Sequence, residues 1–252
     1  MLGAITGDII GSIHEKYSLQ TKEFGLFSPK RYFTDDTVLT VAVADVILNG
    51  GSYTEKFKQY CRKYPGAGYG KTFYNWGMSE NMEPYNSWGN GSAMRVSPVG
   101  FAFDDLDTVL LEAKRTAEVT HNHPEAIKGA QATASAIFLG RKNHSKAEIK
   151  SYIETTFNYN LDQTVEQVQP TDVSCAGCVP QALIAFLEST DFEDAIRNAV
   201  FIGGDTDTIA CITGGIAEAF YGGVPEEIAM QALSILDQPL RTITETFRAK
   251  YC

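Results

Sequence analysis

The sequence lacks the features that mark a membrane-spanning or secreted protein. No stretch approaches the roughly 20 consecutive apolar residues that cross a bilayer. The first five residues carry no basic charge and Asp8 interrupts the apolar start, so no secretory leader is expected. Five cysteines, an odd number in 252 residues, do not suit a secreted disulfide framework. We therefore expect a cytoplasmic protein without a membrane partner.

Basic residues are also scarce. Lysine and arginine total 21 against 31 aspartates and glutamates, which gives a net charge of −10, and no basic run forms a local patch. Such a charge repels nucleic acid and anionic membranes, so neither is expected as a partner. An anionic small molecule would need bound cations, backbone amides or a few well-placed arginines to overcome the field.

Strand signals are missing as well. The sequence contains no convincing hairpin turn and no alternation of strands with helices. Its composition, 44% hydrophobic and 21% charged, is ordinary for a globular protein, and its length can bury one large core. We predict an all-α fold, an orthogonal bundle of about ten helices in a single domain over residues 1–252.

The most informative feature of the sequence is a pair of acidic stretches about 170 residues apart. They are Thr34–Thr37 and Gly203–Thr208. Each opens an apolar helical run and places two carboxylates and threonine hydroxyls at a helix start. Either could serve only as a helix cap, which is a common role for Asp and Thr. A cap needs one side-chain oxygen, however, whereas both stretches repeat the Asp/Thr pattern. Four converging carboxylates would repel one another unless divalent cations lay between them, so we predict a dinuclear metal site.

Helical periodicity and capping signals place the remaining elements. The first helix carries Gly3, Gly7 and Gly11 on one face, which would let another helix pack closely. Gly214 and Gly215 suggest a second tight crossing inside the helix that follows the later acidic stretch. Predicted helices cover 2–14, 35–48, 107–119, 124–141, 146–157, 180–188 and 191–200, with three more beginning near 206, 225 and 239.

Several connecting segments are candidates for function. Residues 16–33 form a loop that could act as a flap, and the aromatic segment 64–91 either packs down as a lid or offers rings for stacking a base. The glycine-rich turn Gly89–Arg95 could bind an anion through its amides, with added charge from Arg95. His121 and His123 are half of all the histidines, although capping or a buried hydrogen bond would also explain either one.

These residues resemble the ADP-ribosylglycohydrolases, a family that includes the dinitrogenase-reductase-activating glycohydrolase and the ADP-ribosyl-acceptor hydrolases. The matching blocks occur in the family's order and extend over nearly the whole chain. They are Gly7–Ser12 with Glu15, Phe33–Thr37, Gly89–Arg95, Thr120–His121 and Gly203–Thr208.

The resemblance implies an all-α bundle with two divalent cations, Mg²⁺ or Mn²⁺, in a central cleft. It also implies that backbone amides of the glycine turn hold the diphosphate of ADP-ribose and that His121 lines the distal ribose and phosphate region. Glu15 matches a flap glutamate that some members use in catalysis. By matching position, the metal ligands would be Thr34, Asp35, Asp36, Asp205, Asp207 and Thr208, and the substrate-binding residues Asn90, Gly91, Ser92, Ala93, His121 and Gly204.

The implied activity is metal-dependent hydrolysis of the glycosidic bond between ADP-ribose and an acceptor. As a hypothesis, Asp36 or Glu15 deprotonates the attacking water or assists the leaving group, since proton transfer needs a carboxylate that is not fully coordinated. The alternatives are a non-catalytic reader of ADP-ribose and a structural protein that retains the fold. The sequence leaves open the acceptor, the choice of Mg²⁺ or Mn²⁺ and the oligomeric state, for which a monomer is expected.

Overall fold

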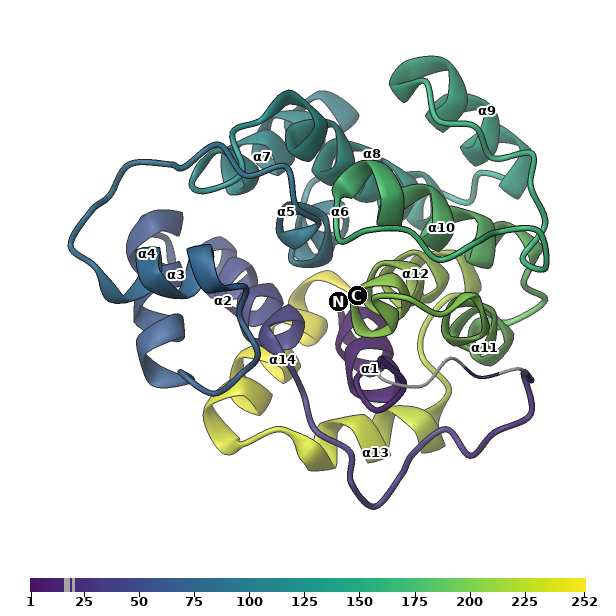
Figure 1. Ribbon diagram of the computed structural model, residues 1–252, viewed down its shortest axis with the longest axis horizontal. Coiled ribbons are helices and arrows are strands. Elements are labelled where there is room, and N and C mark those ends of the chain that lie inside the picture. The colour runs from purple at the N-terminus through teal and green to yellow at the C-terminus, as the bar shows by residue number, and fades with distance from the viewer. Residues whose placement is uncertain (16–18, 20) are drawn as a thin grey trace.

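The protein is all-helical in the part that the structure, a computed structural model, describes, which is every residue except 16–18 and 20 (Figure 1). This confirms the all-α prediction, although that part holds fourteen helices rather than about ten. The helices are α1 (Leu2–Gly11), α2 (Asp35–Asn49), α3 (Tyr53–Lys63), α4 (Lys71–Met78), α5 (Gly91–Met94), α6 (Ser97–Ala102), α7 (Leu106–Glu118), α8 (Pro124–Arg141), α9 (Lys146–Phe157), α10 (Cys175–Glu188), α11 (Phe192–Ile202), α12 (Thr206–Tyr221), α13 (Glu226–Ile235) and α14 (Gln238–Tyr251).

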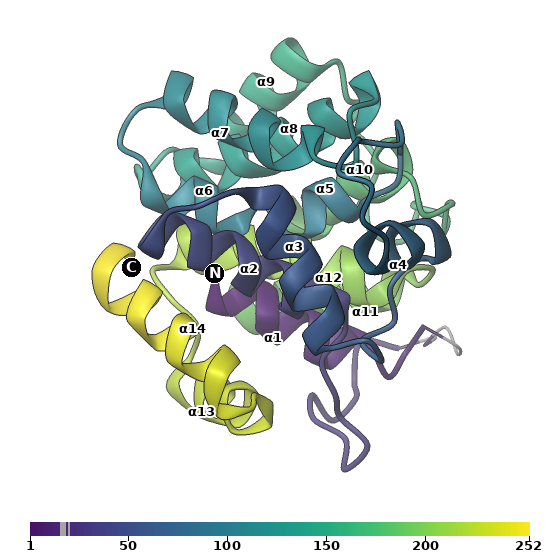
Figure 2. The same cartoon turned by 90° about the vertical axis from the view of Figure 1, so that its left-hand side faces the viewer.

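Helix α1 lies at the centre of the molecule, and all ten of its residues are buried (Figures 1 and 2). Its glycine face packs directly on the backbone of α12. A Cβ atom at any of these three glycines would overlap the facing backbone, so only glycine allows this approach. The facing pairs are Gly3 with Gly214, Gly7 with Ala210 and Gly11 with Thr206. The close crossing predicted from the glycine spacing is therefore confirmed.

The order of these pairs shows that α1 and α12 are antiparallel. The C-terminal end of α1 consequently lies beside the N-terminal end of α12. Glu15 follows the first helix and Asp205 precedes the second, so this packing brings together two acidic segments that are distant in sequence. The backbone contact thus fixes one half of the candidate site.

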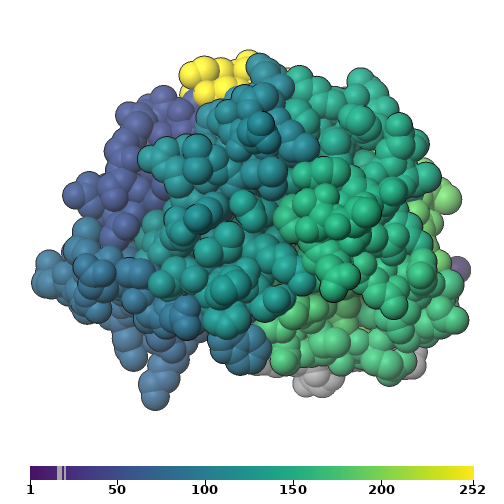
Figure 3. Space-filling view, turned by 90° about the horizontal axis from the view of Figure 1, so that it is seen from above, coloured from purple at the N-terminus to yellow at the C-terminus, as the bar shows by residue number. Residues whose placement is uncertain are grey.

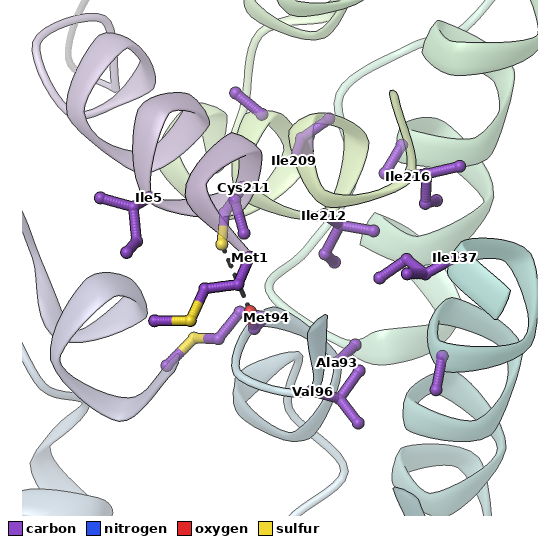
Figure 4. Close-up of a cluster of buried hydrophobic side chains, with 14 of the residues drawn as sticks. Met1, Ile5, Ala93, Met94, Val96, Ile137, Ile209, Cys211, Ile212 and Ile216 are labelled. Carbon is purple, nitrogen blue, oxygen red and sulfur yellow. Dashed lines mark hydrogen bonds between the residues drawn. The ribbon is translucent and has the colours of Figure 1, made fainter. Parts of the chain in front are cut away.

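A cluster of buried apolar side chains joins α12 to the glycine turn (Figure 4). Cys211 of α12 points toward Met94 of α5. The Cys211 thiol also donates to the carbonyl oxygen of Met94 at 3.3 Å. The turn before α5 is therefore held in place by the same helix that carries the second acidic stretch.

The outer helices enclose this centre. Helices α7 to α9 lie on one side and α13 and α14 on the opposite side (Figures 1 and 2). Seen from the first side, the middle of the chain, in teal and green, covers the surface (Figure 3). Among the described residues, none of the helices combines the length and apolarity that crossing a membrane requires.

Some predicted boundaries were wrong. Helix α1 ends at Gly11, not at residue 14, because the chain turns there and the Ser12 hydroxyl bonds the carbonyl oxygens of Ile9 and Tyr32. Helix α10 begins at Cys175 rather than residue 180. Ser174 caps it, and burial of its first turns outweighs the backbone hydrogen bond that Pro180 cannot make.

The aromatic segment was expected to be a loop, but it contains helix α4. Phe73 and Trp76 of this helix are buried, and Phe73 stacks on Tyr69 at a centroid distance of 5.4 Å. The packing interpretation is thus confirmed for these rings. Trp88 remains 55% exposed. The predicted flap, residues 16–33, lies partly outside the described residues.

Candidate metal centre and phosphate-binding turn

The first acidic stretch forms the N-terminal turn of α2. Thr34 caps this helix, since its hydroxyl accepts a hydrogen bond from the Asp36 amide at 3.3 Å. Asp36 is buried and Asp35 is partly buried, and both carboxylates line a cleft. The capping role is therefore taken by Thr34, which leaves both aspartates available for another purpose.

The carboxylate of Asp8 in α1 anchors this N-terminal turn of α2 through hydrogen bonds. Its fully buried carboxylate accepts hydrogen bonds from the Thr34 amide at 2.9 Å, the Thr34 hydroxyl at 2.7 Å and the Thr37 amide at 3.1 Å. The Thr37 hydroxyl also donates to it. One carboxylate on the central helix thus fixes the position and orientation of the stretch that carries Asp35 and Asp36.

The second acidic stretch forms the start of α12. Gly203 and Gly204 adopt φ values of +79° and +80°, a conformation that favours glycine and that turns the chain into the helix. The Thr206 hydroxyl donates to the carbonyl oxygen of Gly11 at 2.9 Å, which ties the turn to α1. Asp207 is buried, and its carboxylate accepts from the amide of Thr208 at 2.8 Å.

The two stretches meet in the folded protein. The Thr208 hydroxyl lies 3.4 Å from Oδ2 of Asp36, within hydrogen-bonding distance. Carboxylate oxygens of Glu15, Asp205 and Asp207 also lie within 4.8 Å of one another. A single acidic centre therefore collects side chains from the end of α1 and the starts of α2 and α12.

Burial and mutual repulsion raise the carboxyl pKa values in this centre. The pKa of Asp35 rises to about 7, first because burial disfavours its charged form and then because Asp8 is nearby. The pKa values of Asp36 and Asp207 are raised well above the ordinary value for the same reasons, burial first and neighbouring aspartates second. The protein's own residues therefore do not compensate the negative charge that these carboxylates carry when they are ionised.

The donor set fits a hard divalent cation. Carboxylate and hydroxyl oxygens are the ligands that Mg²⁺, Mn²⁺ and Ca²⁺ prefer. Oδ1 of Asp36 is buried without a hydrogen-bond partner among the described residues, which leaves it free as a ligand. A cation would also remove the repulsion that raises the neighbouring pKa values. The residues present are therefore suited to metal binding.

The acidic centre forms one end of a cleft of about 410 Å³, and the glycine turn forms the other end. Asn90 joins the two, because its side-chain amide donates to Oδ2 of Asp205 at 2.5 Å and to the Cys178 sulfur at 3.2 Å. The amides of Gly91 and Ser92, which begin α5, have no acceptor in the described protein. These two N–H groups can therefore bind an anion.

His121 and Arg95 are buried beside this turn. A Cβ atom on Gly91 would lie only 2.7 Å from Nε2 of His121, so the imidazole packs against the glycine. Arg95, which the sequence suggested could add charge to the turn, lines the cleft and is fully buried. Its guanidinium lies over the ring of Phe57 at 4.4 Å and donates to the Thr116 carbonyl oxygen at 2.7 Å.

Comparisons with known proteins identify the family of this chain. The sequence model of the ADP-ribosylglycohydrolase family matches residues 1–249. The chain belongs to this family. The resemblance seen in the sequence motifs is thereby confirmed.

Several relatives of this chain carry names that describe an activity. ADP-ribosylhydrolase ARH3 of Homo sapiens is 26% identical over an alignment that covers 90% of this chain and 86% of that protein. ADP-ribosylarginine hydrolase Tri1 of Pseudomonas putida is also 26% identical, with coverage of 77% and 61%. A solved "ADP-ribosylglycohydrolase-related protein complex" has the same fold, with a TM-score of 0.76 at 22% identity and coverage of 99% and 96%.

The cleft of this chain brings together most of the residues singled out in the sequence. The predicted residues that line it are Glu15, Asp35, Asp36, Asn90, Gly91, His121, Asp205, Asp207 and Thr208. Four others support its walls instead. Thr34 binds Asp8, the Ser92 hydroxyl donates to the Ala126 carbonyl oxygen at 2.8 Å, the Ala93 amide donates to Asn90, and Gly204 packs near Pro170.

The sequence did not reveal every residue of the site. In the sequence, Asp8 was noted for interrupting the apolar start of the chain and was given no role, although a lone carboxylate in an otherwise apolar buried helix signals a buried hydrogen-bond network. Lys71 and Phe73 of α4 and Tyr85 also line the cleft. The sequence singled out the aromatic segment 64–91 that carries them, but it did not show which of these residues line the cleft.

Proposed function

We propose that this protein is a metal-dependent hydrolase that cleaves the glycosidic bond between ADP-ribose and an acceptor. The observation that carries the proposal is the acidic centre, where Asp36 meets Thr208 and where Glu15 meets Asp205 and Asp207. Membership of the ADP-ribosylglycohydrolase family and the names of relatives such as ARH3 support the substrate class.

In this proposal, two divalent cations, Mg²⁺ or Mn²⁺, are held between the two acidic stretches. When bound, they would orient the ribose hydroxyls and lower the pKa of a water molecule. The proposed ligands are Thr34, Asp35 and Asp36 on one side and Asp205, Asp207 and Thr208 on the other. Asp8 and Asn90 would keep these ligands in position through the hydrogen bonds described above.

The protein's own residues supply binding and proton transfer. The amides of Gly91 and Ser92 would hold the diphosphate, with Ala93 and Gly204 supporting the wall of the cleft, and His121 would border the distal ribose. Water adds to the anomeric carbon while the bond to the acceptor breaks and the acceptor atom takes up a proton. Glu15 is exposed at the mouth of the centre, so its carboxylate can accept the water proton or return it to the acceptor.

The test is release of ADP-ribose from arginine-linked, serine-linked and small-molecule substrates, each with and without EDTA. We expect release from at least one class of substrate, with activity lost in EDTA and restored by Mg²⁺ or Mn²⁺. Binding of ADP-ribose without release from any substrate would instead support a non-catalytic reader. Full activity in EDTA would contradict the metal-dependent mechanism.

A further inference from the structure

Thr120 connects two buried groups beside the glycine turn. Nη2 of Arg95 donates to the Thr120 hydroxyl oxygen at 3.1 Å, and the same oxygen lies 2.7 Å from Nδ1 of His121. All of these groups are buried or half-buried, so water does not separate them.

The chemistry of these groups sets the direction of the bonds. A guanidinium can only donate, so Arg95 occupies a lone pair of the Thr120 oxygen. Among the hydrogen bonds of the described residues, the Thr120 hydroxyl has no partner other than Arg95 and Nδ1 of His121. Thr120 then has one hydrogen left to donate, and the lone pair on Nδ1 of His121 is the acceptor beside it.

An imidazole that accepts at Nδ1 carries its hydrogen at Nε2 when it is neutral. Two causes keep His121 neutral: its pKa is lowered well below the ordinary value first by burial and then by the charge of Arg95. The charged and titratable groups that face this ring are Arg95 and Tyr85, the latter at a centroid distance of 6.1 Å.

The Nε2 edge of the ring lies against the start of α5. A Cβ atom would lie 2.7 Å from Nε2 if placed on Gly91 and 3.8 Å from it if placed on Gly89. An N–H at Nε2 would therefore stand beside the free amides of Gly91 and Ser92. The opposite tautomer would place a lone pair there, which would repel an oxygen anion.

We propose that Thr120 and Arg95 are positioning residues that hold His121 as the Nε2–H tautomer, ready to donate to an oxygen anion at the glycine turn. The identity of that anion as the diphosphate of ADP-ribose rests on the proposed function. The tautomer itself is a property of the ligand-free protein, so the tautomer of His121 and the identity of the anion can be tested separately.

The first test is ¹H–¹⁵N NMR of protein labelled with ¹⁵N-histidine, with the His121 signals identified by their loss in His121→Gln. Only four histidines are present, so the spectrum is simple. At pH 7 we expect a protonated Nε2 and an unprotonated Nδ1. Thr120→Val removes the hydroxyl at similar volume and should give a mixture of tautomers, whereas Thr120→Ser should restore the wild-type pattern.

A protonated Nδ1 in the wild-type protein, or an unchanged pattern in Thr120→Val, would overturn the inference. The wild-type spectrum alone decides the matter if Thr120→Val does not fold. Calorimetric titration with ADP-ribose gives a second measure, with affinity about tenfold weaker in Thr120→Val and restored in Thr120→Ser. If the wild-type protein has the expected tautomer but does not bind ADP-ribose, the proposed function fails and the inference about His121 stands.

Discussion

The two ends of the cleft handle buried charge in opposite ways. At one end, Asp35, Asp36 and Asp207 are crowded together, and burial and repulsion raise their pKa values. At the other end, Arg95 is buried without a carboxylate partner among the described residues, and the pKa of His121 is lowered. The acidic end is suited to cations and the other end to an anion.

This contrast would explain how a protein of net charge −10 could bind the anionic substrate that we propose. Cations between the acidic stretches would cancel the negative field at one end, and N–H donors would meet the phosphates at the other. Asn90 links the ends, because it precedes the glycine turn and donates to Asp205. The predictions below disturb first the acidic end and then the donor end.

The largest effect is expected for Asp205→Asn. The change removes one charged ligand from the acidic centre while preserving shape, so hydrolysis should fall at least about a hundredfold. Turnover of an ADP-ribosylated peptide at saturating Mg²⁺ measures this. Glu80→Gln is the matched control, since its side chain is 94% exposed and pairs only with Arg62 at the surface. Equal activity in both variants would rule out the proposed role of Asp205.

A smaller loss is expected for Asp8→Asn, which acts through Thr34 and Thr37. An amide nitrogen cannot accept the hydrogen bonds that the carboxylate accepts from the N-terminal turn of α2. Activity should fall about tenfold, and the free energy of unfolding should fall by about 2 kcal/mol. Enzyme kinetics and urea denaturation measure the two effects. A variant that is less stable but fully active would limit Asp8 to a structural role.

At the donor end, Gly91→Ala should weaken ADP-ribose binding about tenfold, because the added methyl group would collide with His121. Gly66→Ala is the control, since a Cβ atom there meets nothing within 4 Å. Calorimetric titration of both variants compares them directly. If the two bind ADP-ribose equally well, the imidazole does not pack on the turn as described.

The smallest effect concerns pH and thermal stability. The folded-state pKa of Asp35, about 7, exceeds its unfolded value, so the folded protein holds a proton between about pH 4 and pH 7 that the unfolded chain has released. The contribution of Asp35 to the free energy of unfolding of the metal-free protein therefore falls as the pH rises through that range. Mg²⁺ competes with this proton for the carboxylate. The rise in the Tm of the protein on adding Mg²⁺ should therefore be about 3 °C larger at pH 8 than at pH 6. Equal gains at both pH values would count against cation binding at these carboxylates.

Much of the fold and part of the site could be predicted because local patterns specify them. The glycine spacing in α1 predicted a close helix crossing, and the repeated Asp/Thr pattern singled out α2 and α12. Helix α4 was missed since its aromatic residues follow no regular period and are buried by distant contacts. The start of α10 was misplaced because a proline rule was given more weight than a serine cap.

The roles of Asp8 and Arg95 depend on three-dimensional contacts that no local pattern encodes. Asp8 binds residues 26 and 29 positions away, and Arg95 binds residues 21 and 25 positions away. The sequence suggested only that Arg95 adds charge to the turn, whereas in the folded protein its guanidinium donates to Thr116 and Thr120. Residues that position others are the hardest to find from sequence alone.

The most direct test of the central claim is the number of Mn²⁺ ions bound by the wild-type protein and by Asp36→Asn, measured by electron paramagnetic resonance. We predict two tightly bound ions in the wild type and the loss of at least one in Asp36→Asn. Absence of tight binding in the wild type, or unchanged binding in the variant, would contradict a metal centre between the two acidic stretches.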